Sequence, residues 1–259
     1  MRIGVTRMSA GGDPGDWIAA AESGYDYFEE NLAPIAVMTE AEFRKVAELP
    51  RITGLKAAAF NCFFGGDVKM YEYPDAWFHD YCARAFERAA LLGGEIAVIG
   101  SAGARSVPEN MTREDAGKRF IDILRIAGDE AEKVNMRVVI EPLNHFECNF
   151  INTVPEGAEL CRSLGHKAVG TLVDFYHYYV ENETPADLVI ARDKLWHAHI
   201  ARPNPDRGAP RNEDRAAVKN YAAALKKAGY SGGRISLECW WRTDYGDEIF
   251  AVMDEFRKI

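Results

Sequence analysis

The stretch TREDAGKRFIDILRIAGDEAEKVNMRVVIE (Thr112–Glu141) contains the unit from which the fold can be inferred. Its first part predicts a helix over residues 112–134, because apolar side chains recur at helical spacing behind Thr112, a residue type that caps helix N-termini. Its last part, RVVIE (137–141), predicts a short buried strand with a glutamate at its end. A helix followed directly by a buried strand is typical of α/β proteins.

Eight short β-rich runs alternate with helical segments along the whole chain. They are residues 2–6, 25–30, 55–60, 95–100, 137–141, 169–174, 195–200 and 234–238. Most are continuously apolar, as expected of parallel strands that helices cover. Eight strand–helix units in roughly 250 residues predict an α/β fold, the (β/α)8 TIM barrel, with residues 1–259 as a single domain. A doubly wound open sheet is the competing fold, but RMSAGGDPGD (7–16) lacks the G-x-G-x-x-G spacing it favours.

Composition restricts the partners and the compartment. The formal net charge of −9 argues against nucleic acid, because phosphate binding needs clustered Lys and Arg. The five cysteines show no C-x-x-C spacing, which favours a reducing cytosol over a disulfide framework. The N-terminus has no signal-peptide pattern, and no apolar run approaches the ~18 residues that a membrane span requires. We therefore expect a cytoplasmic protein without a membrane partner.

Four polar side chains stand at the ends of four successive predicted strands. Glu141 follows RVVI, Asp174 follows VGTLV, His199 lies within LWHAHI, and Glu238 follows RISL. The active site of a TIM barrel lies at the C-terminal ends of its strands, so we expect these side chains to meet at one mouth. His197 points to the same side of its strand as His199, and we expect it one layer deeper, packed and hydrogen-bonded in the barrel interior.

Three carboxylates and one imidazole form a hard, oxygen-rich ligand set. Such a set suits Mn²⁺, Mg²⁺ or Co²⁺ better than a structural zinc, which would draw on thiolates. Without a cation, three carboxylates in one small site would repel each other and take up protons. We expect one divalent metal ion, with Mn²⁺ favoured and Mg²⁺ or Co²⁺ as alternatives.

The chain resembles the xylose-isomerase-like TIM-barrel superfamily, in particular the ketose 3-epimerases of the D-tagatose/D-psicose type. The resemblance covers nearly the whole chain and is most specific between Glu141 and Thr153. The segments that carry it are IEPLNHFECNFINT (140–153), LVDFYH (172–177), HAHIARPNPDRGAP (197–210) and ISLEC (235–239).

The resemblance implies roles for individual residues. The residues that match the family's metal ligands are Glu141, Asp174, His199 and Glu238. Glu141 and Glu238 would also form the catalytic acid/base pair. The matching substrate-binding residues are Glu147, His177 and Arg207. Similar enzymes are often dimers or tetramers, so a homo-oligomer is also expected.

The activity that this implies is C3 epimerisation of a free ketose, a small-molecule sugar. One glutamate would remove the C3 proton, giving a cis-enediolate, and the other would return a proton to the opposite face. The same metal ligands would also serve an aldose–ketose isomerase, a hydroxypyruvate-type isomerase or a keto-sugar lyase. The sequence Glu147-Cys148-Asn149 favours the epimerase over a hydroxypyruvate isomerase, which tends to have an aspartate-Pro-Gly turn there. The sequence leaves these alternatives open.

An endonuclease IV-like DNA repair enzyme is the alternative from a different class. It needs a trinuclear zinc site with extra histidines on strands two and three, whereas these runs end here in FEEN and FNCF. Two departures from the epimerases concern the sugar. His145 stands where they usually have an arginine, and Arg202 where they usually have a glutamate. The metal site is therefore predicted more firmly than the identity of the substrate.

Overall fold

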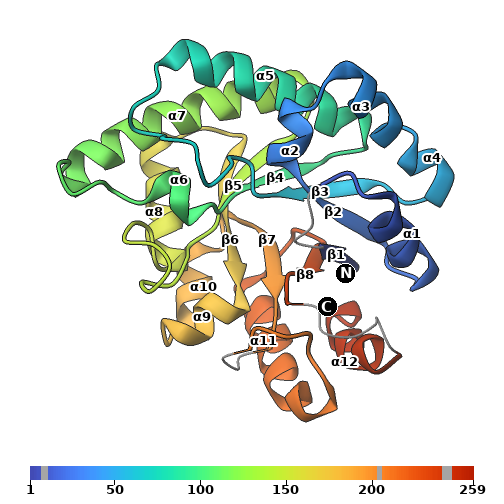
Figure 1. The fold of residues 1–259 in the computed structure, drawn as a ribbon. Coiled ribbons are helices and arrows are strands. Elements are labelled where there is room, and N and C mark those ends of the chain that lie inside the picture. The colour runs from blue at the N-terminus through green and yellow to red at the C-terminus, as the bar shows by residue number, and fades with distance from the viewer. Residues whose placement is uncertain (7–10, 203–205, 241–246) are drawn as a thin grey trace.

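The computed structural model describes the chain except residues 7–10, 203–205 and 241–246. Eight parallel strands form a closed barrel in chain order, and β1 pairs with β8 to close it (Figure 1). The predicted TIM barrel is confirmed, and every predicted strand boundary lies within two residues of the observed one. The strands are β1 (Arg2–Thr6), β2 (Tyr27–Asn31), β3 (Ala57–Asn61), β4 (Ile96–Ile99), β5 (Arg137–Ile140), β6 (Val169–Asp174), β7 (Leu195–Ile200) and β8 (Arg234–Leu237).

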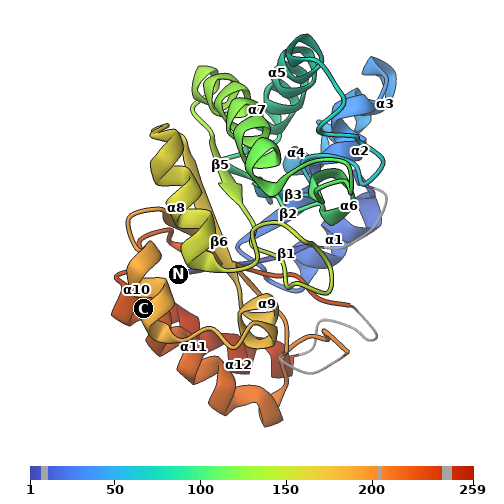
Figure 2. The same cartoon turned by 90° about the vertical axis from the view of Figure 1, so that its left-hand side faces the viewer.

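Helices surround the barrel on its outside. Three of them, α5, α7 and α8, follow one another around it (Figure 2). The helices are α1 (Pro14–Glu22), α2 (Leu32–Val37), α3 (Glu40–Val46), α4 (Leu49–Thr53), α5 (Asp75–Leu91), α6 (Ala102–Arg105), α7 (Arg113–Lys133), α8 (Val154–Leu164), α9 (Phe175–Val180), α10 (Pro185–Ala191), α11 (Arg215–Ala228) and α12 (Asp247–Arg257). No helix in the described part of the chain is long and apolar enough to cross a membrane.

The sequence signals at helix ends act as expected. The Thr112 hydroxyl accepts a hydrogen bond from the Asp115 amide at 3.1 Å, and α7 begins at the next residue, Arg113. Gly229 ends α11 in the left-handed conformation at φ 69°, which glycine adopts without steric cost. A short 3₁₀ turn, Asn212–Asp214, leads into α11.

The barrel interior is filled by a small layer of side chains. Ala58, Ala59, Val98 and Val139 pack there around the Tyr27 ring. Gly4 is required at this point, because a Cβ on it would overlap that ring. The much larger apolar core lies between the barrel and its helices, so the strands are covered on their outer face. This frame fixes the strand ends from which the site is built.

Candidate metal centre and active site

The barrel brings the four predicted metal ligands together. Glu141 lies directly after β5, Asp174 ends β6, His199 lies in β7, and Glu238 lies directly after β8. Each offers one ligand atom, and these atoms all lie within 4.8 Å of one another. All four residues are buried, with at most 4% of their surface exposed. The donor set and its compactness fit one divalent cation.

His199 is oriented by carboxylates on both sides of its ring. Its Nδ1 lies 3.2 Å from Glu141 Oε1 and 3.3 Å from Glu238 Oε2, and its Nε2 lies 2.9 Å from Glu29 Oε1. Burial alone would lower the pKa of His199, but the charges of Glu29 and Glu238 outweigh it and raise this pKa well above its usual value. The distances show that Nδ1 faces the ligand cluster and that Nε2 contacts Glu29.

Glu29 adjoins the ligand cluster, and sequence reasoning missed it. It lies on β2, is fully buried, and its second oxygen is 3.0 Å from His197 Nε2. Burial lowers the pKa of His197 to about 4, so the neutral ring donates its Nε2 proton to Glu29. This confirms the expected position of His197 in the barrel interior. Glu29, His197 and His199 also form a second compact group of possible metal ligands.

The two predicted acid/base residues have opposite electrostatic environments. Burial and the neighbouring charge of Glu238 raise the pKa of Glu141. Burial would also raise the pKa of Glu238, but His199 and Arg207 lower it to about 2. The Asn61 amide donates to Glu238 Oε1 at 3.2 Å, which fixes that carboxylate. Two carboxyl groups of one site thus differ in their affinity for a proton.

Arg207 lies among these carboxylates. Its Nη2 donates to Asp174 Oδ2 at 2.8 Å and to Glu238 Oε2 at 2.9 Å, and its guanidinium lies 4.8 Å from the centre of the Tyr176 ring. The backbone of Arg207 is left-handed, at φ 45°, and its carbonyl accepts from the Trp240 amide at 2.8 Å. The structure therefore brings this predicted substrate-binding residue into the site.

Glu147 and His177 are joined by Asn144, which sequence reasoning did not identify. The Asn144 side-chain amide donates to Glu147 Oε1 at 2.9 Å, and its backbone amide donates to His177 Nδ1 at 3.2 Å. Because Nδ1 accepts, Nε2 carries the proton of His177, and it lies 3.5 Å from Asp174 Oδ2. Glu147 Oε2 lies 3.7 Å from Arg207 Nη1, so all three predicted substrate-binding residues adjoin the cluster.

The two residues that depart from the epimerase pattern, His145 and Arg202, pair with acidic side chains outside the ligand cluster. His145 pairs with Glu181, with its Nδ1 2.6 Å from a carboxylate oxygen. Arg202 pairs with Glu213 and lies 3.4 Å from Asp214. Neither residue is among the four ligands. Trp17 is fully buried, and its indole N–H donates to Glu30 Oε2 at 2.7 Å.

The family of the chain follows from comparison with known proteins. The model of the family described as "Xylose isomerase-like TIM barrel" matches residues 17–259. The chain belongs to this family. Several curated relatives of this xylose isomerase-like barrel are epimerases, at modest identity.

D-psicose 3-epimerase of Agrobacterium fabrum is 30% identical over 150 residues, which are 53% of this chain and 51% of that protein. The 3-dehydro-D-guloside 4-epimerase of Escherichia coli is 32% identical over 125 residues, 46% of this chain and 48% of that protein. These two matches thus span about half the relatives' own length. L-ribulose 3-epimerase of a Methylomonas species is 25% identical over 232 residues, 84% of this chain and 78% of that protein.

Solved structures share the fold of this xylose isomerase-like barrel over its full length. The E. coli 3-keto-D-glucoside 4-epimerase has a TM-score of 0.77 at 22% identity, with 100% of both chains covered. D-psicose 3-epimerase of Clostridium cellulolyticum with D-tagatose has a TM-score of 0.77 at 18% identity, with 100% and 99% covered. At these identities the likeness establishes the fold alone.

Proposed function

We propose that this chain is a divalent-metal-dependent epimerase that removes and returns a proton beside the carbonyl of a keto sugar, at C3 of a ketose. The observation that carries the proposal is the compact buried group of Glu141, Asp174, His199 and Glu238 at one end of the barrel. The epimerases among the curated relatives support the same class of reaction.

The four ligand residues would hold the metal. We propose Mn²⁺, with Mg²⁺ and Co²⁺ as alternatives that three carboxylates and one imidazole also suit. A divalent cation in this group would supply positive charge where the carbonyl oxygen becomes negative, which makes the neighbouring carbon more acidic. Glu29 would keep the His199 ring in its orientation by accepting from Nε2.

Glu141 and Glu238 are proposed to carry the protons. They reach the site from β5 and β8, which are not neighbours in the barrel, so the two carboxyl groups can face a substrate from different directions. One glutamate takes the proton from C3 to leave a cis-enediolate, and the other donates a proton to the opposite face.

Glu147, His177 and Arg207 are proposed to hold the substrate. Arg207 and the protonated Nε2 of His177 are donors, suited to sugar oxygens, and the Glu147 carboxylate is an acceptor, suited to a sugar hydroxyl. Asn144 would keep Glu147 and His177 in place through its two hydrogen bonds. Most of this region is buried, which would exclude water from the enediolate.

A metal-replacement experiment tests the proposal. The chelator-treated protein is reconstituted with Mn²⁺, Mg²⁺ or Co²⁺ and incubated with a panel of ketoses, and the products are separated by chromatography. We expect the C3 epimer of at least one ketose to form, with no product in the metal-free sample. Aldose formation would instead favour the isomerase alternative on the same ligands. Epimerisation that is equally fast without metal would contradict the proposal.

A further inference from the structure

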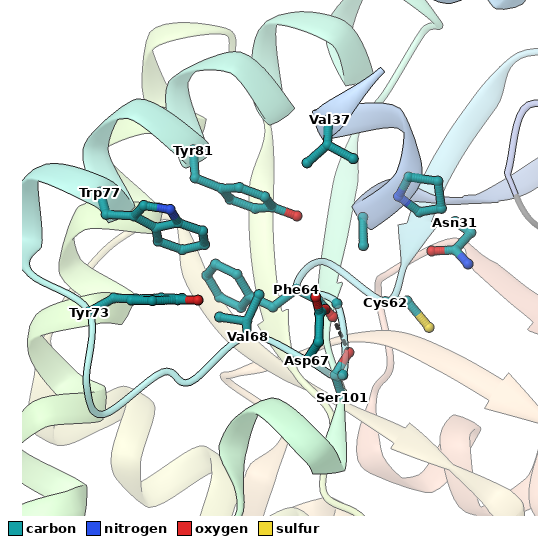
Figure 3. A pocket seen from close by; sticks show the side chains of 14 residues that line it. Asn31, Val37, Cys62, Phe64, Asp67, Val68, Tyr73, Trp77, Tyr81 and Ser101 are labelled. Carbon is teal, nitrogen blue, oxygen red and sulfur yellow. Dashed lines mark hydrogen bonds between the residues drawn. The ribbon is translucent and has the colours of Figure 1, made fainter. Parts of the chain in front are cut away.

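A cavity of about 500 Å³ lies beside the metal centre, over the C-terminal ends of β2, β3 and β4 (Figure 3). Its volume is within the ~300–1,000 Å³ range of pockets that bind small ligands. None of the residues assigned above to metal or substrate lines it. Its walls come from the end of β2, from α2 and α5, and from the segments that follow β3 and β4.

One wall of the cavity consists of aromatic rings. Tyr73, Trp77 and Tyr81 extend from α5 and the loop before it toward Phe64 (Figure 3). The rings of Trp77 and Tyr81 are stacked, with centroids 4.9 Å apart, and those of Phe64 and Tyr81 are stacked at 5.3 Å. Tyr73 lies 4.6 Å from Trp77. Phe64 and Tyr81 are fully buried, so they support the half-buried rings of Tyr73 and Trp77, which present apolar surface to the cavity.

Polar groups complete the lining. Asp67 is exposed and its carboxylate has no hydrogen-bond partner among the described residues, and the same holds for the Tyr73 hydroxyl and the Trp77 indole N–H. The described residues that line the cavity include no Lys and no Arg. Acceptors and donors beside flat apolar rings suit a neutral group rich in hydroxyls, and the absence of cationic side chains there disfavours a phosphate.

The cavity adjoins the metal centre through two consecutive residues. Asn61 donates to Glu238 Oε1 at 3.2 Å, and the next residue, Cys62, lines the cavity. The backbone of Cys62 is left-handed, at φ 45°, so the chain turns sharply between the two sites. Burial and then the charges of Glu238 and Glu141 raise the pKa of the Cys62 thiol to about 12, which is consistent with its closeness to the cluster.

We propose that this cavity binds a neutral pyranosyl group attached to the keto sugar, so that the substrate class is glycosylated keto sugars. The inference rests on the proposed function, because the keto end of such a substrate would lie at the metal centre. The C–H face of a pyranose ring packs on aromatic surfaces, and its hydroxyl groups would pair with Asp67, Tyr73 and Trp77. A free ketose would leave the cavity empty.

A comparison of two substrates tests this subsite in the metal-loaded enzyme. Maltulose is D-fructose with a glucosyl group on O4, so it adds only the ring in question. We expect kcat/KM for maltulose to exceed that for D-fructose at least tenfold. Asp67→Ala and Trp77→Ala should each reduce this ratio at least fivefold, and Trp77→Phe, which keeps a ring but loses the indole N–H, should reduce it less than Trp77→Ala does. Glu159→Ala, an exposed acid on α8, is the matched control and should keep the full ratio.

Direct binding separates this inference from the proposed reaction. Saturation-transfer NMR with methyl β-D-glucopyranoside, which cannot be epimerised by this chemistry, should show contact that Asp67→Ala and Trp77→Ala weaken. If the glucoside contacts the cavity but no sugar is turned over, the result supports the subsite and contradicts the proposed reaction. If D-fructose and maltulose are turned over at equal kcat/KM and the glucoside makes no contact, the result contradicts the subsite but not the proposed reaction. Absence of both contact and turnover would overturn both.

Discussion

Glu141 and Glu238 are adjacent in space but far apart in the sequence, and each would act both as ligand and as proton carrier. We predict that Glu141→Gln and Glu238→Gln each lower kcat by roughly 10²–10⁴-fold, the usual contribution of general acid–base catalysis. The measurement is initial rate at saturating metal, with metal content determined in parallel. Glu159→Gln, on the outer surface of α8, is the control. Wild-type rates in either site variant would contradict the assigned roles.

Gly100 is a residue whose missing side chain shapes the site. It follows β4, and a Cβ at this position would overlap Glu141 Oε2 and lie 3.0 Å from its Cδ. Gly100→Ala should therefore displace a ligand carboxylate and lower kcat/KM at least ~10-fold. The melting temperature should change little, because the displaced atoms are the end of a flexible side chain.

The matched control is Gly117→Ala on α7, where a Cβ would make only an ordinary contact with Phe150. This variant should keep its activity. An active Gly100→Ala enzyme would show that Glu141 need not hold its observed position.

At the residue scale, the end of a predicted strand was the signal that located three of the four proposed metal ligands. Glu141, Asp174 and Glu238 each end or directly follow an apolar run. Glu29 ends such a run too, but Glu30 follows it, and only the pairing across the barrel shows which of the two faces His197 and His199. Asn144 could not be found either, because its role depends on His177, 33 residues away.

At the scale of elements, a buried carboxyl group joins the turn between α9 and α10 to the start of α8. Glu183, in the turn between α9 and α10, accepts from the Val154 amide at the start of α8 at 2.9 Å. Burial, then the nearby acids Asp187, Glu181 and Glu156, raise the pKa of Glu183 to about 8. The folded chain thus holds a proton that the unfolded chain releases above about pH 4.5.

This contribution to stability is complete below pH ~4.5 and is lost as the pH rises to about 8. Glu183→Gln should remove that loss, so the variant's melting temperature should exceed that of the wild type by a few degrees at pH 9 and match it near pH 5. Thermal unfolding at both pH values measures this, with Glu159→Gln as the control. An equal pH dependence in variant and wild type would contradict the shifted pKa.

The strands were more predictable than their connections. Short β-rich runs identified all eight strands, and most of these runs are continuously apolar because a strand covered on both faces needs no polar side. The connection between β2 and β3 contains three short helices, α2, α3 and α4, whose lengths of five to seven residues give too little periodicity to recognise. The cavity beside the metal centre lies partly on α2, and so could not be anticipated.

At the scale of the whole molecule, closure of the barrel is what makes one site from strands β5 to β8. The same closure concentrates three buried carboxylates, and a bound cation should stabilise the folded chain, since the unfolded chain lacks the site. We predict that Mn²⁺ at about 100 times its dissociation constant raises the melting temperature by roughly 5–10 °C. Differential scanning fluorimetry measures this, and Asp174→Asn should lose most of the shift.

The position at which the protein exchanges a proton tests the account most directly. The metal-loaded protein is incubated in D₂O with D-fructose and maltulose, and NMR follows deuterium at each carbon, with a chelator-treated sample as control. The account predicts deuterium at C3 together with a new C3 epimer, and none without metal. Deuterium at C1 with formation of an aldose, or exchange that persists after the metal is removed, would contradict it.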